Sequence, residues 1–189
     1  MPLSDPTKII QSEIHRIVSL LKANKKKEAI NHSLFLSEKF PASVPVIQLL
    51  SNAYIAIGDY QSAIEQYSKL LSADPHNPII LKNLGAMYLK NDQPENAIFT
   101  YNKILNFAPN DAETHYKIGN AYFEKSDFGL AIGFYESALS LNPNSFEALY
   151  NLGNTYLTLK DFIKAVDLFN KCLIINPNHA GLLGNLGIA

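Results

Sequence analysis

The sequence predicts an all-α protein, an α-solenoid in which pairs of antiparallel helices repeat with a period of 34 residues. Two residue types establish the period, because each recurs at one spacing along most of the chain. Alanines and prolines both return every 34 residues: Ala29, Ala63, Ala97, Ala131 and Ala165, and Pro41, Pro75, Pro109, Pro143 and Pro177. A fixed period between 20 and 50 residues is typical of stacked arrays, in which each repeat packs against its neighbours.

This period divides the chain into a short leader and one array. We expect residues 1–9 to form a flexible leader and residues 10–189 to form the array. The repeats are 10–43, 44–77, 78–111, 112–145 and 146–179, followed by a partial sixth repeat, 180–189. In the first repeat, Ile17 and Leu20 stand where later repeats have a small residue and a tyrosine, so we expect this divergent repeat to cap the array.

Each repeat is expected to hold two helices joined by a short polar turn. In the first repeat, apolar residues at helical spacing predict a helix that begins near Pro6, and a second helix follows from about Lys26 to Lys39. In later repeats the second helix should end before the repeating proline, which lacks the amide donor that a helix needs. Pro94 follows a turn, and we expect it at the first helical position, where the missing donor costs little.

Most of the repeating residues indicate packing. Small residues stand eight residues into the later repeats, and we expect them to face the repeating alanines where the two helices cross: Ser51, Gly85, Gly119, Gly153 and Gly187. Aromatic rings at two further positions should fill the space between helices and between repeats: Tyr54, Tyr88, Tyr122 and Tyr156, and Tyr67, Tyr101, Tyr135 and Phe169.

These positions resemble the tetratricopeptide repeat over roughly residues 10–189. The pattern is best seen in the fourth and fifth repeats, at Ile118, Gly119, Tyr122, Ala131, Tyr135, Ala138 and Pro143, and at Leu152, Gly153, Tyr156, Ala165, Phe169, Cys172 and Pro177. The chain departs from the family pattern at Leu36, Leu70, Ile104 and His115. The resemblance implies a right-handed superhelix whose first helices line a concave groove, and this groove generally holds a peptide or a partner protein.

Asparagine recurs on one face of the predicted first helices. Positions six and nine of a repeat share a face because they lie three residues apart, and asparagine occupies one or both of them in each later repeat. Asparagine is unfavourable inside a helix, so its repeated use suggests that its amide is hydrogen-bonded. The amides could bond the backbone of an extended peptide, which would resemble the repeats of the protein O-GlcNAc transferases, or they could bond neighbouring helices.

Aromatic residues are expected to border the same groove, where Tyr116, Tyr150 and Phe123 could grip a ligand or pack between repeats. A carboxylate clamp of the kind that some family members use is absent. That clamp needs lysine at position five of a repeat and asparagine at position nine, and in the repeat with Lys82 at position five, position nine is Ala86. The candidate binding residues are therefore Asn52, Lys82, Asn83, Tyr116, Lys117, Asn120, Phe123, Tyr150, Asn151, Asn154 and Asn185.

Composition argues against several other classes of function. The 16 basic and 17 acidic residues nearly cancel, so we expect no nucleic-acid or membrane partner, and no stretch approaches about 18 apolar residues. The single cysteine, Cys172, excludes an intrachain disulfide and fits a cytoplasmic location. No activated nucleophile, carboxylate pair, nucleotide fingerprint or metal-ligand spacing is present, so we expect no catalytic residue, metal or cofactor in this segment.

The sequence thus predicts a protein–protein interaction scaffold that binds an extended peptide or partner protein in the groove. An alternative is that the chain is the substrate-recognition arm of a larger enzyme, because similar arrays often continue into a glycosyltransferase, sulfotransferase or oxygenase domain, here beyond residue 189. A third hypothesis is self-association through the last helix, because the partial sixth repeat is expected to leave its apolar residues uncovered: Leu182, Leu183, Leu186 and Ile188.

Overall fold

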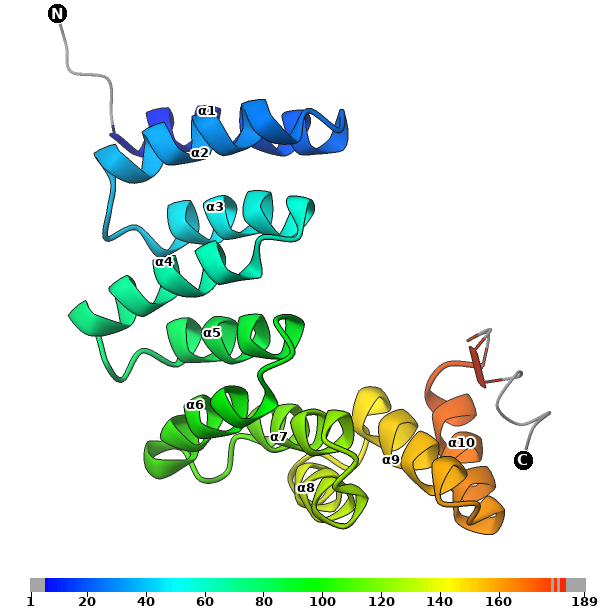
Figure 1. Cartoon of the computed structure of the whole chain (residues 1–189). Coiled ribbons are helices and arrows are strands. Elements are labelled where there is room, and N and C mark those ends of the chain that lie inside the picture. The colour runs from blue at the N-terminus through cyan, green and yellow to red at the C-terminus, as the bar shows by residue number, and fades with distance from the viewer. Residues whose placement is uncertain (1–5, 178, 180, 183–189) are drawn as a thin grey trace, which may run out of the picture. The chain divides into compact units, whose positions relative to one another are not determined.

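The computed structural model describes residues 6–177, 179 and 181–182, and these residues form ten α-helices without a strand. The helices follow one another along the chain (Figure 1), and their bounds are α1 Pro6–Lys22, α2 Lys26–Lys39, α3 Val44–Ile57, α4 Tyr60–Ala73, α5 Pro78–Lys90, α6 Pro94–Phe107, α7 Ala112–Glu124, α8 Phe128–Leu141, α9 Phe146–Thr158 and α10 Phe162–Ile175. The predicted all-α class and the predicted repetition of helix pairs are confirmed. Two compact bodies are present, an N-terminal body of residues 1–92 and a C-terminal body of residues 93–189.

Several helices begin directly after a polar residue whose side chain caps their first turn. The Asp59 side chain accepts a hydrogen bond from the Ser62 backbone N–H at 3.0 Å and caps α4. The remaining side-chain caps belong to Asn77, Asp111, Ser145 and Asp161, which precede α5, α7, α9 and α10. Each cap satisfies an amide that the first turn of a helix leaves without a partner. Pro94 stands at the start of α6, as predicted, so its missing donor breaks no helical hydrogen bond.

The turn inside each repeat requires one residue in the left-handed region of backbone space. This residue is always the fifteenth of its repeat: Asn24, Gly58, Asp92, Ser126 and Lys160, with φ of 57°, 80°, 55°, 61° and 62°. Only Gly58 adopts this conformation without a steric penalty, because the other four carry a Cβ atom. The hairpin geometry therefore imposes this conformation on residues of very different chemistry.

The second helices end where the repeating prolines require it. The residue before each proline is a helix C-cap with an extended φ between −132° and −139°: Phe40, Asp74, Ala108, Asn142 and Asn176. A following proline disfavours helical geometry in the residue before it. The prediction that these prolines terminate the second helices is confirmed.

The N-terminal body is built by α1–α5, in which each helix packs against the next in sequence. Two apolar clusters form its core. One surrounds Ile17, Ala29 and Leu36, and the other surrounds Ala63, Tyr67 and Leu84. No repeat could bury these side chains alone, because each cluster draws residues from helices of two adjacent repeats.

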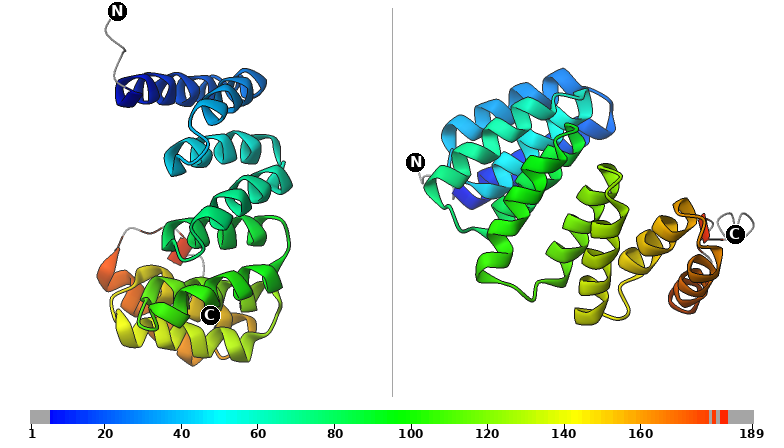
Figure 2. Two further views of the ribbon diagram at one scale, coloured as in Figure 1. Left: turned by 90° about the vertical axis from the view of Figure 1, so that its left-hand side faces the viewer. Right: turned by 60° about the horizontal axis from the view of Figure 1, so that its bottom comes forward.

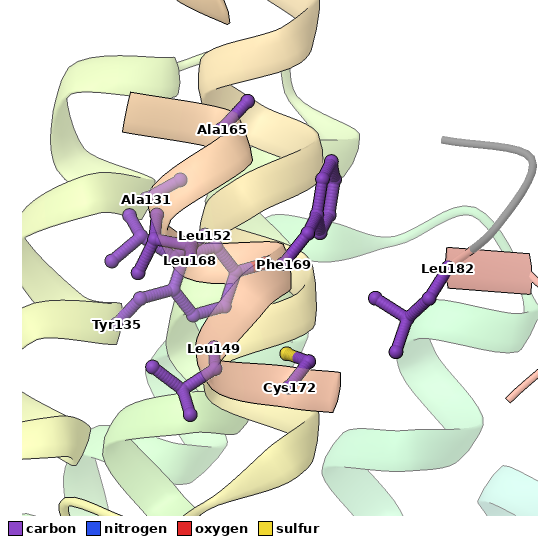
Figure 3. Packing of buried hydrophobic residues seen from close by; sticks show 9 residues of the cluster. All are labelled: Ala131, Tyr135, Leu149, Leu152, Ala165, Leu168, Phe169, Cys172 and Leu182. Carbon is purple, nitrogen blue, oxygen red and sulfur yellow. The ribbon is translucent and has the colours of Figure 1, made fainter. Parts of the chain in front are cut away.

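In the C-terminal body, α7 with α8 and α9 with α10 form antiparallel pairs (Figures 1 and 2), and α8 also contacts α9. One apolar cluster joins the two pairs (Figure 3), with Tyr135, Leu149, Phe169 and Cys172 among its buried members. Leu182 belongs to this cluster and is fully buried, so the expectation that it is left uncovered is wrong. Leu183, Leu186 and Ile188 lie outside the described residues.

The packing partner of the small first-helix residue differs from the prediction. A Cβ atom added to Gly119 would lie 2.6 Å from Cδ1 and Cε1 of Tyr135, and one added to Gly153 would lie 2.6 Å from Cε1 of Phe169. The glycines therefore make room for an aromatic ring of the second helix. At Gly119 and Gly153 our expectation that the small residue faces the repeating alanine is wrong, because the space of the missing side chain is taken by a ring.

Candidate functional site

The predicted groove residues of the C-terminal body lie on two neighbouring first helices. Helices α7 and α9 are in contact, and each begins at a residue whose side chain caps it. We name their candidate residues, all of which are half-buried, the α7–α9 surface: Tyr116, Lys117, Asn120, Tyr150, Asn151 and Asn154. Because the repeat period holds without insertion, Tyr116 and Tyr150 occupy the same repeat position, as do Lys117 and Asn151, and Asn120 and Asn154.

A hydrogen-bond network across three helices joins three of these residues, Tyr116, Asn120 and Asn151, to Tyr135. Asn120 Oδ1 accepts from the Tyr135 hydroxyl of α8 at 2.8 Å and from Asn151 Nδ2 of α9 at 2.8 Å. Asn151 Nδ2 also donates to the Tyr116 hydroxyl at 3.2 Å. Burial raises the pKa of Tyr135 well above its usual value, so its hydroxyl is protonated and remains a donor at neutral pH.

This network bears on whether the asparagine amides bond neighbouring helices or a peptide. For Asn120 and Asn151, the alternative in which the amides bond neighbouring helices is observed. A hydrogen bond from Asn120 to a ligand would have to come from its Nδ2 group, because its Oδ1 already accepts two bonds. Ligand binding by these amides stays a prediction.

The three aromatic candidates pack within the C-terminal body. The Tyr116 ring lies 6.1 Å from the ring of Tyr135, and the Tyr150 ring is stacked on Phe146 at 6.0 Å. Phe123 meets Phe128 edge-on at 5.5 Å. Each of these ring contacts lies within a single repeat, so they do not show the packing between repeats that the alternative predicted, and each candidate ring is partly exposed.

A cavity of about 350 Å³ opens beside this surface, where α7 and α9 begin and α8 ends. Its walls include Glu113, Tyr116, Lys117, Asn142, Ser145 and Glu147. Two glutamates and one lysine therefore line a space large enough for a side chain, and Lys117 Nζ lies 5.7 Å from the Tyr116 ring centroid. Such walls suit a polar or basic group.

Sequence reasoning missed four of these wall residues, namely Glu113, Asn142, Ser145 and Glu147. Glu113 and Glu147 could have been found, because they stand 34 residues apart at the second position of their repeats. Asn142 and Ser145 lie in the connection between α8 and α9, and periodicity alone does not show that this connection faces the first helices.

The other candidates lie elsewhere in the chain. Asn52 is exposed on α3, while Lys82 and Asn83 are half-buried on α5, all three in the N-terminal body. Asn185 falls outside the described residues. This body has its own cavity of about 380 Å³ between α2, α3 and α4, lined mainly by apolar atoms and including Ile47 and Leu70. None of the predicted binding residues lines this cavity.

Cys172 serves packing. The side chain is fully buried, and burial raises the pKa of its thiol to about 11, so it is uncharged at neutral pH. Its Sγ donates a weak hydrogen bond to the Phe146 carbonyl at 3.8 Å. Among the residues that the structure describes, no three His, Cys, Asp or Glu side chains converge on a point where a metal ion could be held.

The repeated helix pairs, their left-handed turns and the rings packed against glycine define a helical-repeat protein with hydrogen-bonding groups on its first helices. Three family models match the sequence: tetratricopeptide repeat models over residues 54–118 and 146–179, and a TPR repeat model over residues 119–160. Together they span residues 54–179, about two thirds of the sequence. The chain belongs to the tetratricopeptide repeat family.

Solved structures show the same fold. A crystal structure of MamA is 29% identical over 74% of this chain and 81% of that chain, with a TM-score of 0.65. MamA from residue 41 to its end, from Desulfovibrio magneticus RS-1, is 22% identical over 94% of this chain and 98% of that one, with a TM-score of 0.72. YrrB, described as a TPR protein with an unusual peptide-binding site, is 22% identical over 96% and 97%, with a TM-score of 0.65.

A search of the curated proteins finds no match. Of the helices that the structure describes, none has the length and apolar character needed to cross a membrane.

Proposed function

We propose that this protein is an interaction scaffold that binds an extended segment of a partner polypeptide along the α7–α9 surface. The observation that carries the proposal is the cavity lined by Tyr116 and Lys117, because the Tyr116 hydroxyl also accepts a hydrogen bond from the Asn151 amide. A segment lying across these residues would find donors for its backbone carbonyls and a space for one of its side chains. YrrB, with its peptide-binding site, has a fold similar to this chain and supports the proposal by analogy.

The charges around the cavity suggest which side chain it accepts. Glu113 and Glu147 contribute two negative charges and Lys117 one positive charge, so the walls carry an excess of negative charge. A lysine or arginine of the partner would be attracted by this excess, while its aliphatic stem could pack against the Tyr116 ring. The proposal therefore favours partner segments with a basic residue.

The network described above pre-positions the surface. Asn120 and Asn151 are each held by a neighbouring helix, so their remaining hydrogen-bonding groups point in defined directions before a ligand arrives. Binding then costs less side-chain entropy than it would on a surface of mobile amides. The two interpretations of the asparagines are compatible, because an amide that bonds a helix through one atom can bond a peptide through the other.

A selection with random peptides tests the proposal. Twelve-residue peptides displayed on phage are selected on the full chain, and the binders are labelled and measured by fluorescence anisotropy. We expect Lys117→Ala and Glu147→Gln each to change the affinity by about 3- to 10-fold, which corresponds to roughly 0.7–1.4 kcal/mol. Lys103→Ala is the matched control. Lys103 lies on α6, where its ammonium group is placed over the Phe99 ring of the same helix, and it does not line the cavity.

Selected peptides that bind Lys117→Ala, Glu147→Gln and the control with the native affinity would refute this location. Asn154→Ala and Asn151→Ala are measured in the same assay together with their melting temperatures. If both bind and melt as the native chain does, the asparagines have no part in recognition.

A further inference from the structure

Helix α10 exposes two large apolar side chains to an unusual degree. Ile163 and Ile174 are 86% and 83% exposed, the highest values among the large hydrophobic residues that the structure describes. They lie 11 residues apart, about three helical turns, and therefore on the same side of the helix. Asp167 and Asn170 lie between them and are also exposed. We name Ile163, Asp167, Asn170 and Ile174 the α10 stripe.

Packing within the repeat array does not explain the two isoleucines. The positions equivalent to Ile163 and Ile174 in the earlier second helices are exposed and carry a polar residue or glycine: Lys27, Gln61, Glu95 and Gly129, and Glu38, Ser72, Asn106 and Ser140. Each of those second helices is followed by a further repeat. A following repeat thus requires no apolar residue at these positions, and packing against such a repeat does not account for the isoleucines of α10.

The order of residues in the stripe indicates a different contact. The spacing of four, three and four residues is that of a helix seam, and the order apolar, acidic, amide, apolar is complementary to its own reverse. We propose that α10 packs against α10 of a second copy of this chain, with the two helices antiparallel about a twofold axis. Ile163 then meets Ile174 of the second copy, and Asp167 meets Asn170 of the second copy.

Antiparallel pairing gives each residue of the α10 stripe a partner of matching chemistry on the second copy. Each Asn170 amide can donate to the Asp167 carboxylate of the second copy, so the polar centre of the interface is hydrogen-bonded. A parallel pair would instead place the two Asp167 carboxylates opposite each other. A twofold axis also produces a closed dimer, because the same surface is used on both copies.

The charge of Asp167 is already compensated on its own helix. Lys171 Nζ lies 2.6 Å from Asp167 Oδ2, and both side chains are more than half exposed. Partial covering of Asp167 by a second copy would therefore not isolate a single charge.

The contact involves one helix of 14 residues from each chain, which is small for a stable dimer. We expect a weak dimer, with a dissociation constant on the order of 100 μM.

Sedimentation velocity of the full chain, from about 5 μM to about 500 μM, tests for this dimer. The native chain should shift from monomer to dimer across this range, whereas Ile174→Lys should stay monomeric with an unchanged circular dichroism melt, because the side chain is exposed. Ser140→Lys is the matched control, since it adds the same charge at the equivalent exposed position of α8 and should leave the dimer intact. A native chain that is monomeric throughout, or an Ile174→Lys chain that dimerises like it, would overturn the proposal.

Disulfide trapping tests the direction of pairing. Chains with Ile163→Cys and chains with Ile174→Cys are mixed and oxidised. Antiparallel pairing predicts disulfides mainly between the two different variants, while predominant disulfides between identical variants would overturn the antiparallel arrangement. Cys172 should not interfere, because it is fully buried. The α10 stripe shares no residue with the α7–α9 surface, so this proposal is independent of peptide binding.

Discussion

Replacing two glycines of the fourth repeat by alanine should change stability in opposite directions. Gly119 lies in α7 and Gly133 in α8, both inside helices. A Cβ atom at Gly119 would lie 2.6 Å from two carbons of the Tyr135 ring, whereas one at Gly133 would have no neighbour within 4 Å. The two substitutions remove the same backbone freedom from the unfolded chain, so the difference between them isolates the contact with the ring.

The magnitudes follow from two opposing effects. Alanine is favoured over glycine inside a helix by about 0.5–1 kcal/mol, so Gly133→Ala should stabilise the protein by that amount. Gly119→Ala gains the same amount but overpacks the core, which costs about 1–3 kcal/mol. The ring has little room to yield, because Tyr135 is only 1% exposed and its hydroxyl is bonded to Asn120. Gly119→Ala should therefore be less stable than Gly133→Ala by about 1–3 kcal/mol.

Urea unfolding followed by circular dichroism measures this difference, and thermal unfolding should show it as about 2–4 °C per kcal/mol for a chain of this length. Gly153→Ala is a second test, because its Cβ would meet Phe169 at the same 2.6 Å. Equal stability of Gly119→Ala and Gly133→Ala would refute the reasoning that the glycine exists to accommodate the ring.

Three further predictions concern stability. Burial raises the pKa of Tyr67 to about 12, so between pH 10 and pH 12 the hydroxyl loses its proton in the unfolded chain before it does in the folded chain. The free energy of unfolding should therefore fall over this range by roughly 2–3 kcal/mol more in the native chain than in Tyr67→Phe, as measured by urea unfolding at a series of pH values. Lys160 has a φ of 62°, so Lys160→Gly should stabilise the chain by roughly 0.5–1 kcal/mol in thermal melts, and a loss of stability would contradict this. Ala131 is fully buried, so Ala131→Leu should cost about 1–3 kcal/mol, and a cost below half of that range would count against the packing described.

Periodicity was sufficient to predict the helix pairs, because each helix end depends on residues close in sequence. The second helix of the first repeat ends at Lys39, as predicted, since Pro41 follows its C-cap residue Phe40. The left-handed turn residues could not be predicted from residue type, because Asp92 and Lys160 adopt the same conformation as Gly58. In the turns it is the closure of the helix pair that determines the backbone.

The candidate site was predictable as a surface and not as a set of contacts. The spacing of Asn120, Asn151 and Tyr116 placed them on the first helices, and the structure brings them together. Their partners could not be predicted, because Asn120 bonds Tyr135 and Asn151, which are 15 and 31 residues away on two other helices. A hydrogen-bond partner at that distance depends on how the helices pack.

The fifth repeat shows which part of Tyr135 serves the fold and which serves the surface. Phe169 occupies the equivalent position, and its ring fills the space over Gly153 as the Tyr135 ring does over Gly119. Because phenylalanine achieves this packing without a hydroxyl, the hydroxyl of Tyr135 is not needed to bring the two helices together. Its contribution is the hydrogen bond to Asn120, which connects the buried ring to the α7–α9 surface. Phe169 cannot make the equivalent bond to Asn154, so the two repeats share one packing arrangement and present different polar surfaces.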